Sequence, residues 1–109
     1  MIDDPAEVID LVTKMEAHLP IPVNPTGETS RQLRSRGLKI GSDRVLFIQR
    51  VFYMGDEGGI MCDVTPTKDA KIVFVVSLTH LRVAPRHPLA QAIRTYQQRR
   101  VSRIARSDR

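Results

Sequence analysis

Residues 44–54, with the sequence RVLFIQRVFYM, decide the fold class of this 109-residue chain. They are rich in valine, isoleucine, phenylalanine and tyrosine, which fit the pleated, half-buried surface of a sheet. Two similar stretches follow, separated by the glycine-rich loop 55–59 and the turn 66–69. Short connections of this kind join antiparallel neighbours, so the sequence predicts a three- to four-stranded antiparallel meander. The predicted strands are residues 38–40, 44–54, 60–65 and 71–83, with a tight turn at 41–43.

A helix is predicted near the N-terminus. Asp4 can cap it, Pro5 suits its first turn, and Glu7 follows the cap at the spacing of a capping box. Apolar residues then recur at helical spacing as far as Leu19, and Pro20 ends the pattern. With a second helix at the C-terminus, the expected class is α+β, a meander flanked by two helices.

The C-terminal helix begins near residue 88 or 89 and carries an apolar stripe that ends at Tyr96. Arg100 falls inside the continuation of that stripe, where a core residue should stand. We therefore expect the helix to dock through Tyr96 and to project or fray beyond Gln98.

The domain organisation follows from these patterns. Residues 1–98 are expected to form a single α+β domain, and residues 99–109 a basic C-terminal helical extension. Residues 20–37 form a proline-rich crossing that could be mobile, with a short helical piece capped by Thr29 or Ser30 and closed by Gly37.

Composition excludes several classes of protein. Cys62 is the only cysteine, so neither an internal disulfide nor a cysteine-based zinc cluster can form within one chain, and a small buried apolar role is the preferred interpretation. The longest apolar run, residues 72–76, is far too short for a membrane span, and no secretory signal pattern opens the chain. We expect a cytoplasmic protein without membrane association.

The two longest predicted strands are apolar on both faces, although an exposed meander normally alternates apolar and polar residues. Two short helices can cover only one face of such a sheet. The sequence therefore predicts a homodimer, in which a partner chain covers part of the other face.

Charge is unevenly distributed along the chain. Residues 1–19 are mainly acidic and residues 85–109 are rich in arginine, within a net charge of +5. The two ends could neutralise each other, or the basic end could bind a polyanion. The polyanion-binding candidates are Arg99, Arg100, Arg103 and Arg106.

Other constellations are weaker. Arg82, Arg86 and His87 form a candidate anion pocket on charge alone. A catalytic histidine needs an orienting carboxylate, and Asp63 lies on the strand next to the one that carries His80. The scattered histidines do not indicate a metal site, the loop 55–59 fits a hairpin better than a cation site, and no cofactor is predicted.

These observations do not identify a specific role. The first hypothesis is a small non-catalytic protein-binding or adaptor module that acts as a homodimer with an unknown protein partner. The alternative is a nucleic-acid-binding protein that contacts RNA or DNA backbone through the arginine-rich helix. A small enzyme with a His/Asp site is the second alternative.

Overall fold

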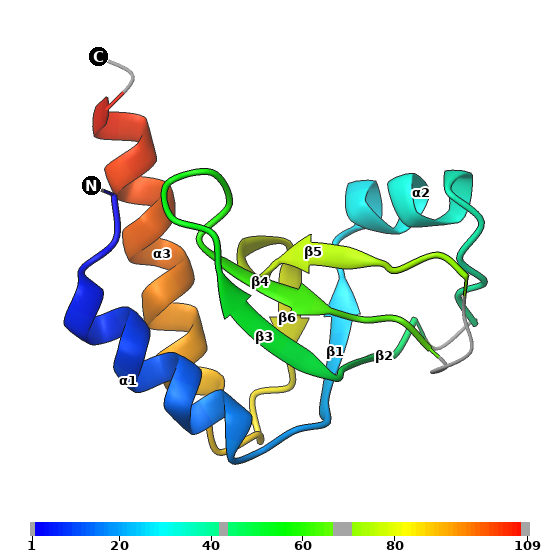
Figure 1. Ribbon diagram of the computed structural model, residues 1–109, viewed down its shortest axis with the longest axis horizontal. Coiled ribbons are helices and arrows are strands. Elements are labelled where there is room, and N and C mark those ends of the chain that lie inside the picture. Colours follow the sequence, from blue (N-terminus) through cyan, green and yellow to red (C-terminus); the bar gives the residue numbers. More distant parts are fainter. Residues whose placement is uncertain (1, 42–43, 67–70, 108–109) are drawn as a thin grey trace.

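The computed structural model describes residues 2–41, 44–66 and 71–107 and has an α+β architecture (Figure 1). The predicted turns at 41–43 and 66–69 lie partly outside the described residues, as do residues 108–109 of the predicted extension. In chain order the elements are α1 (Pro5–Glu16), β1 (Ile21–Pro25), α2 (Gly27–Ser35), β2 (Leu46–Ile48), β3 (Arg50–Tyr53), β4 (Ile60–Asp63), β5 (Val75–Ser77), the 3-10 helix η1 (Leu78–His80), β6 (Leu81–Val83) and α3 (Ala90–Ser107).

The strands form two antiparallel three-stranded sheets, in the orders β2-β1-β6 and β3-β4-β5, instead of one meander. Each edge strand of one sheet continues along the chain into an edge strand of the other. Gln49 alone links β2 to β3, and η1 links β5 to β6. The two sheets are therefore joined through the chain at both edges, and their strands enclose one core in a closed circuit of strands.

The passage from one sheet to the other explains part of the apolar character on both faces of residues 44–54. Leu46 and Ile48 point into the core from β2, whereas in β3 the inward residues are Val51 and Tyr53. The inward side chains thus belong to even-numbered residues before Gln49 and to odd-numbered residues after it. Gln49 is where the chain passes from one sheet to the other. These four side chains contact the same core, whereas the alternate residues Phe47, Phe52 and Met54 remain 48%, 37% and 53% exposed on the outer face.

The central strand β1 lies inside the predicted crossing 20–37. Val23 has register partners on both sides, but Pro22 pairs only with Phe47 and Pro25 only with Leu81. A strand tolerates proline where only one side must be paired. The predicted strand 38–40 was wrong: these residues form no strand, and Leu38 is buried after the end of α2.

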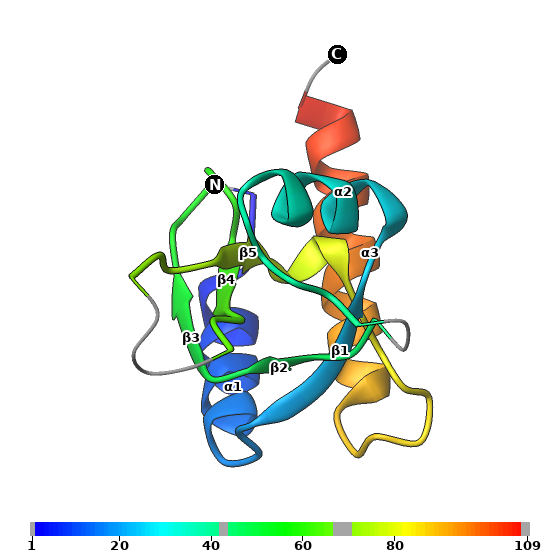
Figure 2. The same ribbon diagram turned by 90° about the vertical axis from the view of Figure 1, so that its right-hand side faces the viewer.

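The helices lie on two sides of the sheets. α1 and α3 lie side by side, and α2 lies at the opposite end of the molecule (Figures 1 and 2). Asp4 caps α1 by accepting a hydrogen bond from the Ala6 amide, as predicted, whereas α2 is capped by Thr26 instead of Thr29 or Ser30. Within the described part of the chain, no helix is both long enough and apolar enough to span a bilayer.

Candidate functional site

A buried ion pair joins the two ends of the chain. The Arg100 guanidinium donates to Asp3 Oδ2 over 2.6 Å, and the two side chains are only 3% and 1% exposed. Arg100 thus occupies the core position that the apolar stripe predicted, because a carboxylate from the N-terminal segment neutralises it there. The prediction that α3 projects or frays beyond Gln98 was wrong for the turn that contains Arg100, since this residue is buried.

Two tyrosines complete the cluster around Asp3. Tyr53 donates to Asp3 Oδ2 over 2.9 Å, while the Tyr96 hydroxyl accepts the Ile60 amide over 3.0 Å. Burial, followed by the hydrogen bond to Asp3, raises the pKa of Tyr53 to about 12. Burial likewise raises the pKa of Tyr96. Both phenols therefore stay protonated at neutral pH, and Tyr96 also donates to Asp3 Oδ2, over 3.5 Å.

The loop between β3 and β4 closes over this cluster. Arg100 Nη2 donates to the carbonyl of Asp56 over 2.7 Å, and the Asp56 carboxylate accepts the Ile2 amide over 2.8 Å. Gly59 has a φ of 68°, and a Cβ there would collide with the Tyr96 hydroxyl and with Arg100. The predicted glycine-rich loop is thus the point where the N-terminus, β4 and α3 meet.

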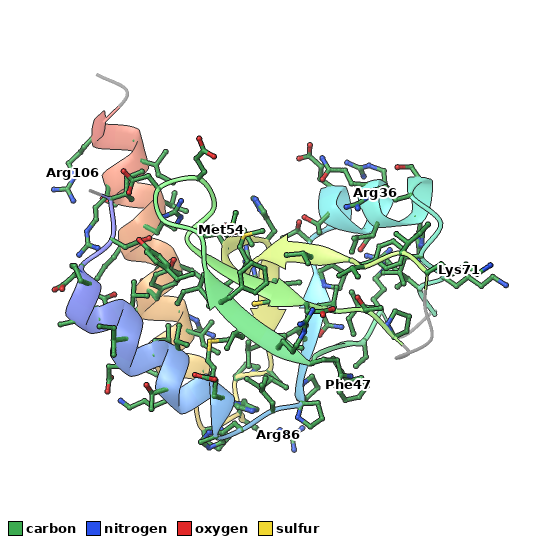
Figure 3. The ribbon with its side chains drawn as sticks, in the orientation of Figure 1. Arg36, Phe47, Met54, Lys71, Arg86 and Arg106 are labelled. Atoms are coloured by element: carbon green, nitrogen blue, oxygen red, sulfur yellow. The ribbon has the colours of Figure 1, made fainter. Side chains whose placement is uncertain are left out.

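The other polyanion candidates differ in how they are engaged. Arg99 pairs with Glu7 over 3.0 Å, and Arg103 lies 3.8 Å from the same carboxylate. Glu7 therefore contacts α3 instead of completing the predicted capping box. Arg106 is exposed and makes no ion pair with a described residue; Figure 3 shows it on the last turns of α3, away from the sheets.

The three anion-pocket candidates have different surroundings. His87 accepts the Leu89 amide on Nδ1 and lies against the His18 ring, and burial together with His18 lowers its pKa. Arg86 is exposed at the lower end of the view in Figure 3. Arg82 instead lines a cavity with Arg94, which sequence reasoning missed because nothing in the pattern places β6 against this part of α3.

The residues of the enzyme hypothesis have other contacts. Asp63 accepts hydrogen bonds from the Arg50 guanidinium at 2.8 and 3.0 Å. Burial acts to raise the pKa of Asp63, but hydrogen bonds with Thr65, followed by those from Arg50, lower it overall. Cys62 is fully buried, and burial raises its pKa to about 12. His80 is exposed beside α2. Among the residues that the structure describes, no cluster of histidine, cysteine and carboxylate side chains could hold a metal ion.

A further cavity of about 480 Å³ lies along α1 and reaches Tyr53 of β3. Ile9, at 67% exposure, is its most prominent apolar side chain. Glu16 is the one charged residue in its lining. The lining residues are Pro5, Val8, Ile9, Val12, Thr13, Glu16 and Tyr53.

Comparison with known proteins identifies no relative: no family model, no curated protein and no solved structure matches the chain.

Proposed function

We propose that this chain is a protein-binding module that pairs with a second copy of itself through the outer face of α1. The observation that carries the proposal is the apolar cavity along that helix, whose lining includes the exposed side chain of Ile9. A hollow with an apolar lining can take up apolar side chains of a partner, and burying apolar surface is favourable by about 25 cal/mol per Å².

The outer face of α1 suits an antiparallel pairing of two copies. Pro5 lies four residues before Ile9 and Thr13 four residues after it, so all three share one face of the helix. A two-fold axis at Ile9 would place Pro5 of each copy against Thr13 of the other. The same surface of α1 would then face its own counterpart across the axis, as an isologous interface requires.

Electrostatics also permits this arrangement. Glu16 is the one charge in the cavity lining and lies seven residues after Ile9. In an antiparallel pair the two Glu16 carboxylates would be at opposite ends, roughly 21 Å apart at 1.5 Å of rise per residue. That separation is about two and a half times the Debye length of roughly 8 Å at physiological salt, so their repulsion would be largely screened.

Sedimentation velocity from about 1 µM to about 1 mM tests the proposal. The wild-type chain should convert from monomer to dimer as its concentration rises, and Ile9→Glu should remain monomeric because the new carboxylates would meet at the axis. Ile72→Glu is the matched control: Ile72 is 51% exposed and follows Lys71, which Figure 3 shows at the opposite end from α1.

Two results would contradict the proposal. One is a wild-type chain that stays monomeric across the whole concentration range. The other is equal loss of association in Ile9→Glu and Ile72→Glu, which would show that added charge acts without regard to the surface. Far-UV circular dichroism of both variants confirms that the fold is retained.

A further inference from the structure

The cavity beside Arg82 has a volume of about 500 Å³ and lies between η1–β6 and the outer side of α3. Two arginines from different elements, Arg82 of β6 and Arg94 of α3, line it. The lining contains no carboxylate. Its full set of residues is Thr79, Arg82, Arg94, Gln97, Gln98, Val101 and Ser102.

The walls of this cavity are held in place by hydrogen bonds. Gln97 Nε2 donates to the carbonyls of Leu78 and Leu81, both over 2.7 Å, and so joins α3 to η1 and β6. Arg82 Nη1 donates to the carbonyls of Thr79 and Leu81 at 3.2 and 3.1 Å. These bonds orient the guanidinium, while its Nε and Nη2 donors make no hydrogen bond to a described residue.

No described carboxylate compensates the charge of either arginine. The described carboxylates that approach α3 belong to Asp3 and Glu7, and they pair with Arg99, Arg100 and Arg103. Those arginines lie on the opposite side of α3 from Arg94, which shares its face with Gln98 and Val101 at helical spacing. Neither Arg82 nor Arg94 makes an ion pair with a described residue.

We propose that this groove binds a small organic phosphate, whose phosphate group lies between Arg82 and Arg94. Guanidinium groups suit this ligand because they present paired planar donors to phosphate oxygens. The volume lies within the range of small-molecule sites. The Gln98 amide, the Ser102 hydroxyl and the exposed Val101 side chain line the remainder of the groove and would contact the organic part.

The test is an NMR titration of the labelled full chain with adenosine monophosphate and, separately, with inorganic phosphate, at constant ionic strength. We expect saturable shifts for the Thr79, Arg82 and Arg94 signals, with the nucleotide binding more tightly than inorganic phosphate. Arg82→Gln and Arg94→Gln should each weaken binding by about tenfold, the loss expected for one charge-assisted contact.

Arg31→Gln is the matched control, since Arg31 is also exposed and makes no ion pair with a described residue. It removes the same net charge from α2, so its affinity should equal that of the wild type. Shifts that grow linearly without saturation would overturn the proposal, as would an Arg31→Gln variant that binds as weakly as Arg82→Gln.

A single-stranded oligonucleotide forms the last arm of the experiment. The groove proposal is wrong if the oligonucleotide binds while the mononucleotide does not, and if Arg31→Gln weakens oligonucleotide binding as much as Arg94→Gln does. That result would show that the positive surface acts as a diffuse polyanion site. The Ile9→Glu variant should bind phosphate normally, which keeps this result separate from the outcome of the dimer test.

Discussion

Replacing Arg100 by methionine should destabilise the fold far more than any other change of one arginine on α3. Methionine keeps much of the apolar stem but removes the donors to Asp3 Oδ2 and to the Asp56 carbonyl. Asp3 would then be a carboxylate with 1% side-chain exposure and no cation beside it. The Tyr53 hydroxyl would be its remaining strong donor.

The magnitude follows from this burial. Removing one partner of a buried ion pair costs about 3–5 kcal/mol, because the surviving charge stays in a poorly solvated place. The whole free energy of unfolding of a small domain is only about 5–15 kcal/mol. The variant should therefore lose a third or more of its stability at the middle of these ranges.

Urea denaturation followed by circular dichroism measures the effect. With a slope of about 2 kcal/mol per molar urea, the midpoint should fall by roughly 2 M. Arg99→Met is the matched control, because Arg99 pairs with Glu7 but is 56% exposed. An exposed pair contributes less than about 1 kcal/mol, so its midpoint should move by less than about 0.5 M.

A double variant tests the cause of the loss. Adding Asp3→Asn to Arg100→Met removes the unpaired buried charge and should restore part of the lost stability. The reasoning is refuted if Arg100→Met and Arg99→Met have equal midpoints, or if the double variant is less stable than Arg100→Met alone.

Two further predictions concern the neighbouring core. Gly59→Ala should lower the thermal midpoint in calorimetry, because its Cβ would collide with Tyr96 at a φ of 68°. Gly27→Ala should leave the midpoint unchanged or raise it, because its Cβ would lie 4.0 Å from the Arg31 side chain. The reverse order of midpoints would contradict the packing. Burial raises the pKa of Cys62 to about 12, so a thiol reagent at pH 8 should label Cys62 only when urea unfolds the chain. Prompt labelling of the native chain would contradict this prediction, because it would show that the thiol is accessible. Because the folded pKa exceeds that of the unfolded thiol, Cys62 stabilises the fold fully below about pH 8.5 and progressively less as the pH rises toward 12.

Local patterns predicted most of the element types. The cap at Asp4 and the apolar spacing that follows it are confirmed in α1. The strand-forming stretches contain β2 to β6, although the strands are shorter than predicted. These signals are local, so they can be read without knowledge of the rest of the chain.

The strand β1 was missed because its two prolines argue against a sheet in isolation. Pro22 and Pro25 are tolerated because β2 and β6 each pair with only part of the strand. The switch of sheets at Gln49 was missed for a similar reason: apolar residues on both faces fit a dimer as well as they fit a closed circuit of strands.

The sequence alone determined that this chain is an α+β protein with a helix toward each end, and that an arginine occupies a core position in the last helix. Only the tertiary structure decided what that arginine does. Arg100 is buried because Asp3, ninety-seven positions away in the chain, lies beside it and neutralises it. On the other side of α3, Arg82 and Arg94 line the groove and form no ion pair with any residue that the structure describes. Helical spacing indicates which face of an element a residue occupies. Whether a charge on that face is compensated depends on contacts between distant parts of the chain, because the compensating group is whichever one the fold places nearby.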